Sequence, residues 1–506
     1  MGIINHQSVL DRMKPYSTPE RPLYVVGGAV RDMLLNRPVH DLDFAMPGPT
    51  QALARQVADS LGGGLYVMDE VRDTTRVVLD TGGPQRLFLD FATFRAEDLD
   101  SDLRSRDFTI NAMAFDVADP GRLIDPTGGF ADLREKRIRA CLPTSLHNDP
   151  ARVLRAVRQA LSFEFRIDPD TIRQIRTAAP LLSRISPERQ RDELFKMLDG
   201  GQVSRAIQLL DHLGVLTAVL PELNDLKGVT QSAPHVDDVW EHTLAVVGHL
   251  DHLLAALVGA YQERSSTDLV TGLGVMRLGR YREQFAQHFA QSLKPERSPR
   301  ALLLMAALYH DISKPATRSE ETDGKVRFLR HPERGAQVLA DRARALALSN
   351  DEVVRMQRIV DHHMRCHFMT TTLLMDGELP SRRTIFRYFR AAGLAGVDIC
   401  LLSLADLRGT FGITLPQDHW LAELDVCRAL LEAYWEQSEQ VVSPPRLISG
   451  HDLIDQFAMK PGWMIGRLLD AIRESQAAGE ISSRDEALEF ARRWLAQPPA
   501  KPEEGE

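Results

Sequence analysis

Hydrophobic and polar positions follow two different patterns along this chain. Before about residue 135, short apolar runs are separated by glycine, proline and polar turn residues, which is typical of strands. The run at 23–26 enters Gly27-Gly28 and continues as a helical pattern to Leu35. Strand candidates are residues 23–26, residues 74–80 and 86–94 around the turn Thr81-Gly-Gly-Pro84, and residues 110–117, which also fit a short helix. This part is predicted to be a mixed α/β head.

Downstream of the head, apolar residues recur at helical spacing, as in residues 149–165, 187–198 and 203–213. The predicted fold is therefore multidomain and mostly α-helical after the head. The predicted domains are residues 1–139 (head), 140–232 (helical neck and body), 233–440 (a histidine-rich helical domain with an insertion at 261–299), 441–497 (a small helical tail) and 498–506 (a frayed terminus).

The composition is that of an ordinary globular protein. The 506 residues are 43% hydrophobic and 26% charged, and the length suggests about three domains. The most apolar run, residues 301–309, is far shorter than the ~20 residues of a membrane span, and the first 22 residues lack the apolar core of a signal peptide. We expect a cytoplasmic protein with no membrane partner; the oligomeric state is left open.

Charge and cysteine content narrow the function only slightly. The net charge of −9 argues against a nucleic-acid partner, yet residues 133–158 carry seven basic and two acidic residues, and a local basic surface is enough to attract phosphate. The four cysteines form no CxxC pair, so neither a zinc knuckle nor a disulfide framework is expected. They are predicted to be buried or incidental thiols.

A glycine turn and a carboxylate pair are the sharpest local feature. A strand that runs into Gly27-Gly28 and then a helix exposes backbone N–H groups that can cradle a phosphate, and Arg31 adds a charged donor. Asp41 and Asp43 are two residues apart, so on a strand both carboxylates point to one face. Two such carboxylates can hold Mg²⁺ beside the phosphates, as metal-assisted phosphoryl transfer requires.

Together, the segment Gly27-Gly-Ala-Val-Arg-Asp32 and the pair Asp41-Leu-Asp43 resemble the signature of the DNA-polymerase-β-like nucleotidyltransferases. The continuation from Leu34-Leu-Asn-Arg37 resembles the branch that contains bacterial tRNA nucleotidyltransferases with an HD domain and poly(A) polymerases. The resemblance implies a polymerase-β-like head and a third catalytic carboxylate, Asp90, on the strand Leu87 to Arg95. An inward-facing Asp90 could alternatively pair with an arginine.

Residues 104–114 (Arg-Ser-Arg-Asp-Phe-Thr-Ile-Asn-Ala-Met-Ala) resemble a second family block, which supports the sugar and phosphates. The resemblance implies this role for Arg106 and Asp107, and a carboxylate suits the choice of ribonucleotides because it accepts a hydrogen bond from a ribose hydroxyl. The family usually has two adjacent arginines before this Asp. Ser105 replaces the first of them, which leaves Arg106 to carry the charge.

The segment Asn148-Asp-Pro-Ala-Arg152 resembles the family block that reads the base, which usually begins Glu-Asp. Asp149 and Arg152 then correspond to the base-reading pair, and Arg155 and Arg158 lie near the phosphates. Cytosine and adenine both present an amine donor beside a ring-nitrogen acceptor, so an Asp–Arg pair accepts C and A and rejects G and U. Asn148 replaces the usual Glu, which bears on how the pair is oriented.

The order His … His-Asp … Asp in the third region resembles the HD phosphohydrolase superfamily. The matching residues are His242, His310, Asp311 and Asp406, and a second metal position is implied for His331 with His362 or His363. Imidazole and carboxylate groups suit a divalent transition metal or Mg²⁺. Some bacterial tRNA nucleotidyltransferases carry such a module, with phosphatase and cyclic-phosphodiesterase activity, and the ligands here are complete.

These resemblances predict an enzyme that transfers CMP and AMP from CTP and ATP, with Mg²⁺ and without a nucleic-acid template, to the 3′-hydroxyl of tRNA. Residues 447–454 and 460–463 resemble the family's tail, which contacts the tRNA elbow; His451-Asp452 there is expected to be structural. Poly(A) polymerase and a restricted CC- or A-adding enzyme are alternatives within the class. An HD phosphohydrolase with an RNA-binding head, and a nucleotide sensor without turnover, are alternatives outside it.

Overall fold

The computed structural model describes residues 6–39, 41–80, 86–258, 268–294, 297–322 and 324–496. The chain folds into two compact units. The first comprises Met1–Glu193 and Gln208–Val219, and the second comprises Leu194–Ile207 and Leu220–Glu506. The boundary between the two units therefore falls within residues 140–232, which the sequence predicts to be a single neck and body.

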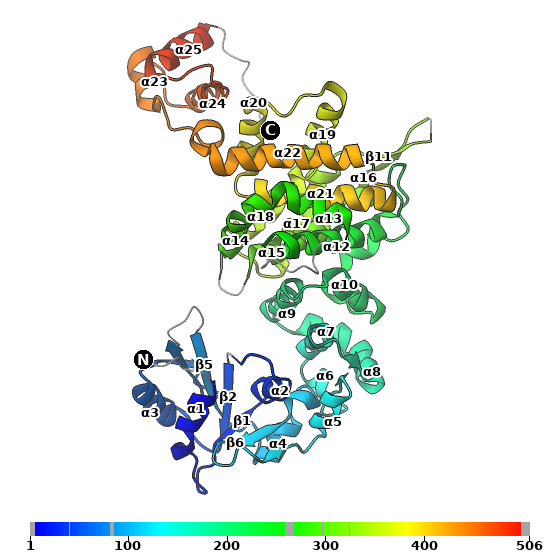
Figure 1. Ribbon diagram of the computed structural model, residues 1–506, viewed down its shortest axis with the longest axis vertical. Coiled ribbons are helices and arrows are strands. Elements are labelled where there is room, and N and C mark those ends of the chain that lie inside the picture. The colour runs from blue at the N-terminus through cyan, green and yellow to red at the C-terminus, as the bar shows by residue number, and fades with distance from the viewer. Residues whose placement is uncertain are drawn as a thin grey trace. The chain divides into compact units, whose positions relative to one another are not determined.

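The first unit is built on a seven-stranded sheet with the strand order β3-β4-β5-β2-β1-β6-β7 (Figure 1). Its strands are β1 (Tyr24–Val26), β2 (Asp41–Met46), β3 (Gly64–Asp69), β4 (Thr74–Asp80), β5 (Arg86–Thr93), β6 (Ala114–Asp116) and β7 (Leu123–Ile124). Only β2 and β5 run parallel; the other pairs are antiparallel. The predicted α/β head is confirmed.

One face of this sheet is apolar because side chains alternate along each strand. Leu42 and Phe44 of β2 and Leu89 and Phe91 of β5 are buried, and the ring of Phe44 stacks on that of Phe91. Helix α3 (Gln51–Leu61) packs against β3 and β4 with its apolar side. The alternation places Asp41, Asp43 and Asp90 on the opposite face, which leaves that face free for chemistry.

The strand predictions hold closely at the centre of the sheet and less well at its edge. The predicted strand 74–80 is β4, and the prediction 86–94 is β5 without its last residue. Residues 110–117 split into a 3-10 turn (Thr109–Asn111) and β6, while β3 and α3 were not predicted. The predicted turn at residues 81–84 lies outside the described residues.

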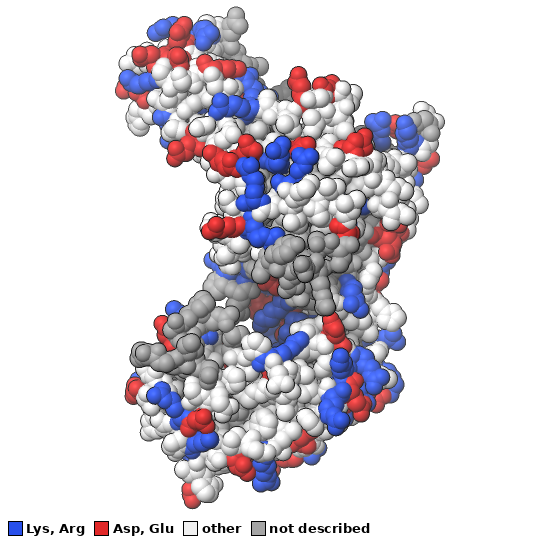
Figure 2. Space-filling view, viewed as in Figure 1, with Lys and Arg blue, Asp and Glu red and all other residues white. Residues whose placement is uncertain are grey.

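Helices follow the sheet in the first unit, and α7 (Ala151–Phe163) is the one that matters for the site. Its buried side includes Val153, Leu154 and Val157, and three arginines at i, i+3 and i+6 lie on another side. Figure 2 shows Lys and Arg side chains interspersed with acidic ones over the helical part of this unit. The other helices here are α1 (His6–Met13), α2 (Gly28–Leu34), α4 (Leu99–Arg104), α5 (Gly129–Arg134), α6 (Ser145–Asn148), α8 (Pro169–Ala178) and α11 (Leu216–Val219). The helices α9 (Pro187–Asp199) and α10 (Val203–His212) each belong partly to the first unit and partly to the second.

The second unit is helical and has α15 (Pro299–Tyr309) at its centre, buried at nearly every position. A helix that is apolar on all sides belongs in a core rather than at a surface. Around it lie α12 (Val239–Val258), α17 (His331–Ala345), α18 (Asn350–His362), α19 (Arg365–Asp376), α21 (Ala395–Phe411) and α22 (Gln417–Glu436). Much of the predicted insertion at 261–299 forms α13 (Leu269–Leu278) and α14 (Arg282–Ala290). Tyr281, directly before α14, and Phe285, within α14, are buried in the same core.

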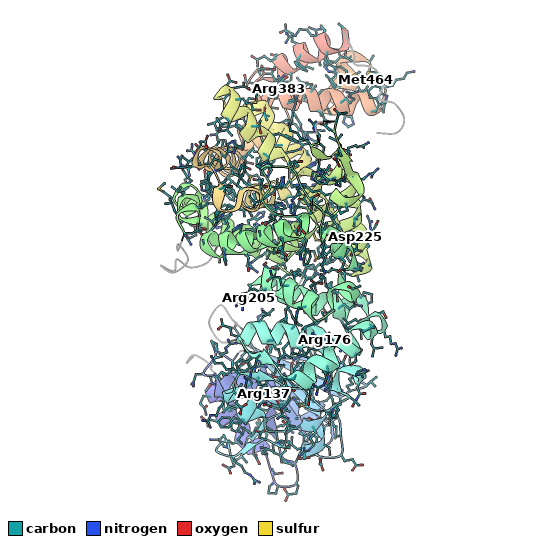
Figure 3. All side chains as sticks on the ribbon, turned by 90° about the vertical axis from the view of Figure 1, so that its right-hand side faces the viewer. Arg137, Arg176, Arg205, Asp225, Arg383 and Met464 are labelled. Carbon is teal, nitrogen blue, oxygen red and sulfur yellow. The ribbon has the colours of Figure 1, made fainter. Side chains whose placement is uncertain are left out.

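The tail is a small three-helix module with its own apolar cluster around Leu453, Leu468 and Ile472. It consists of α23 (Gly450–Phe457), α24 (Trp463–Ala477) and α25 (Arg484–Ala496). Ion pairs join it to α20 (Arg382–Ala392), including Arg383 with Glu480 and Arg387 with Glu474, each at 2.6 Å (Figure 3). The predicted frayed terminus, residues 498–506, lies outside the described residues.

Among the described residues, no single helix has the length and apolar character of a membrane span. One sharply bent pair, Arg382–Ala392 with Ala395–Thr414, meets the length and composition test only when the two are taken together.

Candidate active sites

Three carboxylates meet on the open face of the head sheet. Asp41 and Asp43 lie on β2, and Asp43 is directly opposite Asp90 on the parallel strand β5. Burial, then the neighbouring charge of Asp90, raises the pKa of Asp43 to about 6, with Asp41 adding to the shift and Arg106 opposing it. Such mutual repulsion favours the binding of a cation among these oxygens.

Asp90 is consistent with both interpretations of its sequence: a third carboxylate of the site and the partner of an arginine. Its carboxylate lies beside Asp43 and also accepts two hydrogen bonds of 2.7 Å from the Arg76 guanidinium on β4. The arginine fixes the orientation of Asp90, since a bidentate pair allows little rotation.

Gly27 forms the tight turn beside these carboxylates, with φ +74°, a conformation that L side chains rarely adopt. A Cβ there would lie 3.0 Å from the Arg106 guanidinium and 3.4 Å from Asp43 Oδ2. Gly28 begins α2, and Arg31 on that helix hydrogen-bonds to Asp32 and Asn111 and stacks 4.4 Å from the centre of the Phe163 ring. The turn is thus compatible only with glycine, and Arg31 is held rigidly.

Arg106 and Asp107 are each anchored by a neighbour. Arg106 donates to the buried Asp102 at 3.1 Å. Asp107 accepts from the Phe108 backbone N–H at 2.7 Å and from Arg155 at 2.5 Å. Burial opposes ionisation of Asp107, but Arg155 and these hydrogen bonds hold its pKa below the usual value.

Two of the arginines expected near the phosphates bind acidic side chains in this structure. Arg155 contacts Asp107 and also Glu193 of α9, and Arg158 donates to Glu193 at 2.7 Å. The helix face was predicted from its spacing, but the acidic partner on α9 was not. A role for either arginine toward phosphate stays a prediction.

Asp149 and Arg152 lie next to each other, and each has a further partner. The Arg152 guanidinium donates to the backbone carbonyls of Ser105 and Arg106 and lies 3.8 Å from Asp149. Both Asp149 carboxylate oxygens accept from Arg189, at 2.8 and 2.9 Å. Asn148 stands where the family usually has Glu, and its side-chain amide donates a hydrogen bond to the Thr144 hydroxyl.

Sequence reasoning missed Arg189. It lies in the first turn of α9, where the helix dipole disfavours a positive charge. That unfavourable position was a signal that the side chain has an acidic partner elsewhere.

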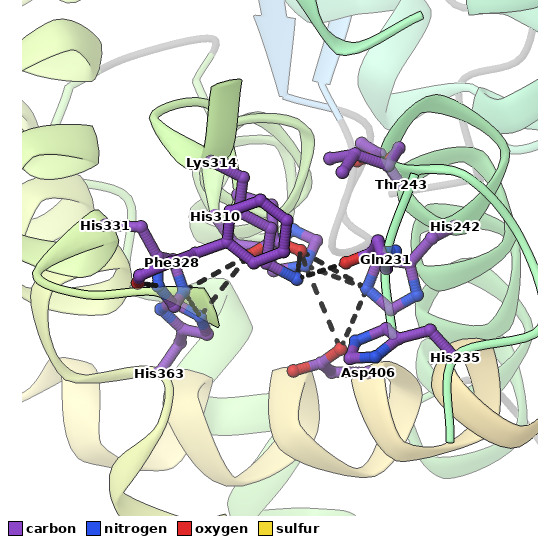
Figure 4. Close-up of polar contacts among 12 residues, drawn as sticks. Gln231, His235, His242, Thr243, His310, Lys314, Phe328, His331, His363 and Asp406 are labelled. Atoms are coloured by element: carbon purple, nitrogen blue, oxygen red, sulfur yellow. Dashed lines mark hydrogen bonds and ion pairs between the residues drawn. The ribbon is translucent and has the colours of Figure 1, made fainter. Parts of the chain in front are cut away.

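In the second unit, one group of side chains comes together from three helices. The His242 Nε2 atom of α12 lies 3.1 Å from Asp406 Oδ1 of α21 and 3.4 Å from Asp311 Oδ2, and His310 Nε2 lies 3.2 Å from the same Asp311 oxygen (Figure 4). All four are buried. His242, His310 and Asp406 have ligand atoms close enough to share one metal ion.

A second group uses the other oxygen of Asp311. Asp311 Oδ1 lies 3.2 Å from His331 Nε2 and 3.9 Å from His363 Nε2. His362, which directly precedes His363, is not part of this group. Its side chain points away from the group, and its Nδ1 atom lies 3.4 Å from Asp361. Of the two histidines that the sequence left open, the structure therefore brings His363 and not His362 to this group, since successive helical residues point about 100° apart.

The histidines of both groups are oriented by the backbone. The Nδ1 atoms of His310, His331 and His363 each lie 2.7 Å from a main-chain carbonyl, three residues earlier in sequence. A carbonyl only accepts, so each Nδ1 carries the proton and each Nε2 lone pair faces the group, as metal-binding histidines require. Burial, followed by repulsion from His310 and His331, lowers the pKa of His363 to about 3.

A cavity of about 650 Å³ opens onto both groups. Its polar lining includes Lys314, whose ammonium lies 2.6 Å from Asp311 and 2.7 Å from Gln231, and His235, whose ring meets that of His242 edge-on. Phe328 and Phe411 contribute apolar walls. The sequence pattern indicated His310 and Asp311 but not Lys314, which lies three residues after Asp311.

Three of the four cysteines meet in the core of the second unit, as buried thiols. Cys366, Cys400 and Cys427 come from α19, α21 and α22. The Cys427 thiol donates to the Cys400 carbonyl at 3.4 Å, and Tyr388 and Ser403 direct their hydroxyl protons to carbonyls rather than to sulfur. The sulfur atoms of the three cysteines lie close enough together to share one metal ion, which the scattered spacing in the sequence did not indicate. The fourth cysteine, Cys141, is half-buried and lies outside this group.

A head that carries a group of carboxylates and a helical domain that carries groups of histidine and aspartate together define a class of protein: a metal-dependent enzyme that acts on phosphoryl groups. Comparisons with known proteins identify its family. Residues 23–139 match the model of the poly A polymerase head domain, residues 164–227 the probable RNA- and SrmB-binding site of polymerase A, and residues 282–399 the HD domain.

Relatives match the chain over nearly its whole length. The chain is 31% identical over 495 residues to an A-adding tRNA nucleotidyltransferase of Deinococcus radiodurans, covering 96% of this chain and 99% of the relative. It is 30% identical over 476 residues to a CC-adding tRNA nucleotidyltransferase of Geobacter sulfurreducens, covering 94% and 93%. The chain therefore belongs to the tRNA nucleotidyltransferase family.

Solved structures agree on the fold. A CCA-adding enzyme in complex with ATP matches with a TM-score of 0.60 at 21% identity, over 97% of this chain and 95% of the other. The Thermotoga maritima CCA-adding enzyme in complex with tRNA matches with a TM-score of 0.54 at 20% identity, over 97% of each chain.

Proposed function

We propose that the protein transfers CMP and AMP from CTP and ATP to the 3′-hydroxyl of tRNA and so builds or repairs the CCA end. The observation that carries this proposal is the group of Asp41, Asp43 and Asp90 on one face of the head sheet, beside the Gly27 turn. Family membership supports tRNA as the acceptor, and relatives named as A-adding, CC-adding and CCA enzymes support CTP and ATP as substrates.

The donor set of the head fits Mg²⁺, because it consists of carboxylate oxygens, which this hard cation prefers. When bound to Asp41 and Asp43, Mg²⁺ would neutralise the triphosphate and make the 3′-hydroxyl a better nucleophile. Asp90, held by Arg76, keeps the negative charge of the group fixed in place. Arg31 and Arg106 border the turn, where they are suited to hold sugar and phosphate oxygens.

Base choice is assigned to Asp149 and Arg152. The carboxylate accepts from the exocyclic amine of C or A, and the guanidinium donates to the adjacent ring nitrogen. Guanine and uracil would place acceptor against acceptor and donor against donor, at a cost of roughly 1–3 kcal/mol for each unsatisfied group. Because Asp149 is held by Arg189, base binding requires Asp149 to share or leave this partner.

One gel tests the proposal and separates the alternatives. The protein is incubated with tRNA transcripts that end before the first C, before the second C and before the terminal A of the CCA end, with CTP, ATP or both. Completion of all three supports full CCA addition. Extension limited to the Cs or to the last A identifies a restricted enzyme, long A tails identify a poly(A) polymerase, and no extension refutes the transferase.

We propose, as a second activity, metal-dependent hydrolysis of phosphoesters at the HD site. The specific observation is the bridging position of Asp311, whose two oxygens face the two groups of histidines. Imidazole-rich groups of this kind suit Mn, Fe, Ni or Mg ions. The test is release of phosphate from a nucleoside 2′,3′-cyclic phosphate or a nucleotide monoester with each metal in turn; no turnover with any of them would refute it.

Two further assignments stay predictions. The tail module is expected to contact the elbow of tRNA, and the protein is expected to act in the cytoplasm. Removal of residues 441–506 would test the first: we expect weaker binding of whole tRNA and unchanged binding of a minihelix that lacks the elbow.

A further inference from the structure

His367 borders the HD cavity but differs from the histidines that face the two metal groups. The Nδ1 atoms of three of them, His310, His331 and His363, lie on main-chain carbonyls. His367 of α19 instead has a carboxylate on each side. Its Nε2 atom lies 2.9 Å from Asp406 Oδ2, and its Nδ1 atom lies 3.3 Å from Glu423 Oε1. The ring thus contacts a metal-facing residue rather than the space where a metal would bind.

Glu423 of α22 is fully buried, at 0% exposure. A buried carboxylate is costly unless an opposite charge or hydrogen bonds compensate it, and the His367 ring supplies the nearest charge partner. Glu423 and His367 therefore hold each other in place within the core. Neither was singled out in the sequence, because they are 56 residues apart and in no shared motif.

The contact divides the two oxygens of Asp406. Oδ1 lies 3.1 Å from His242 Nε2 and 3.8 Å from His310 Nε2, on the side of the first metal group. Oδ2 is occupied by His367. Because one hydrogen bond uses one lone pair of Oδ2 and fixes the rotation of the carboxylate, the other oxygen, Oδ1, is the one better placed to bind a metal.

We propose that His367 and Glu423 are positioning residues of the HD site, which make Asp406 a one-oxygen ligand of the first metal ion. The proposal rests on the HD site proposed above. Outer partners of metal ligands typically contribute 10–100-fold to metal affinity, so the effect is measurable.

The test uses the full chain with Asp41→Asn and Asp43→Asn, so that bound Co²⁺ reports the HD site and not the head. Co²⁺ affinity and stoichiometry are measured by calorimetry, and ligand geometry by the visible absorption of the bound ion. Into this background go His367→Ala, His367→Gln and Glu423→Gln. The matched control is His362→Ala, a nearby histidine outside both groups. Metal-free thermal unfolding of every variant reports whether the fold is kept.

We expect His367→Ala to weaken Co²⁺ binding about 10–100-fold and change the absorption spectrum without changing the stoichiometry. His367→Gln, whose amide can still donate to Asp406 Oδ2, should recover most of the affinity, and Glu423→Gln should lose about 3–10-fold. His362→Ala should match the background.

Three outcomes would overturn the proposal. Unchanged affinity and spectrum in His367→Ala would show that the contact is only structural. Loss of one Co²⁺ equivalent would make His367 a direct ligand, and failure of glutamine to restore affinity would exclude the donor role. If the background chain binds no Co²⁺ at all, the HD site itself fails, an outcome distinct from the other three.

Discussion

The two sites of this protein are built on different physical plans. In the head, carboxylates on adjacent strands lie on an open sheet face, and the pKa of Asp43 is raised to about 6, first by burial and then by the charge of Asp90. In the HD domain, histidines and aspartates lie in a closed helical core. Burial there opposes the ionisation of Asp311, but His310 and Lys314 hold its pKa well below the usual value.

The difference predicts what each site binds and how firmly it is preformed. The head concentrates negative charge on oxygens, and its arginines offset only part of this charge, because the pKa of Asp43 stays raised to about 6; this favours a hard cation that arrives with its triphosphate. The HD core compensates its carboxylates with histidine and lysine before any metal arrives, and it fixes the imidazole orientations through backbone carbonyls. Substitutions should therefore abolish chemistry in the head and change metal affinity in the HD domain.

The largest expected effect separates the two sites by activity. Asp43→Asn should lower nucleotide addition to tRNA at least about 1,000-fold, because it removes a charge that the metal needs in the transition state. Radiolabelled CTP incorporation measures the transferase, and phosphate release measures the HD site, which should be unaffected. Asp59→Asn, at an exposed position of α3, is the control. Transferase activity within tenfold of the wild type would contradict the assignment of Asp43.

The next effect tests which of two adjacent histidines belongs to the HD site. His363→Ala should remove one of two bound metal equivalents or weaken it by about 100-fold, since it deletes a direct ligand. His362→Ala should leave both equivalents intact because that side chain contacts Asp361 instead. Metal content after dialysis against Mn²⁺ decides between them. The reverse pattern would assign His362, the other histidine that the sequence allows, to the site.

A smaller effect is expected from substitutions in the head that change base discrimination. Asp149→Ala should reduce the preference for CTP and ATP over UTP and GTP by about 10–100-fold, the equivalent of one or two unsatisfied groups. The ratio of kcat/KM values for the four nucleotides measures it. Arg189→Ala is the informative companion: loss of discrimination would show that Arg189 orients Asp149, whereas a lower KM with intact discrimination would show that it competes with the base. Unchanged discrimination in Asp149→Ala would refute base recognition by this residue.

Local features of both sites could be predicted from the sequence, and their partners could not. The two-residue spacing of Asp41 and Asp43 and the three-residue spacing of Arg152, Arg155 and Arg158 fix faces through strand and helix geometry alone, whereas Asp149 lies before α7 in extended backbone. Arg189, by contrast, meets Asp149 across 40 residues. Which of His362 and His363 turns inward depends on how α18 is rotated against its neighbours, a tertiary property that adjacent identical residues do not reveal.

The same limit applies to the fold. The strands β4 and β5 alternate clearly because one face of each is buried. Edge strand β3 has mostly exposed or half-buried positions, so its sequence shows no such alternation and it was not predicted. Helices α13 and α14 looked polar enough for an insertion, yet the few large side chains beside and within them, such as Phe285, are buried in the core.

The smallest effect concerns stability, and it tests directly whether the charge of Asp43 is only partly compensated. The pKa of Asp43 is about 6 in the folded chain, above the ordinary value of 3.8, so the folded state binds the proton more tightly than the unfolded state. Stability contributed by this group is therefore lost as the pH rises from about 4 to 6, and the deficit persists above that range. Asp43→Asn removes the deficit.

At pH 7.5 without divalent metal, this variant should be more stable than the wild type by roughly 1 kcal/mol, a value reduced for the partial exposure of the group. The corresponding rise in Tm is about 2–4 °C, measured by calorimetry, and it should vanish at pH 4. Mg²⁺ with CTP should stabilise the wild type and not the variant. A variant that is less stable than the wild type at pH 7.5 would mean that the neighbouring arginines already compensate Asp43 in full, and the contrast between a partly compensated head and a compensated HD core would not hold.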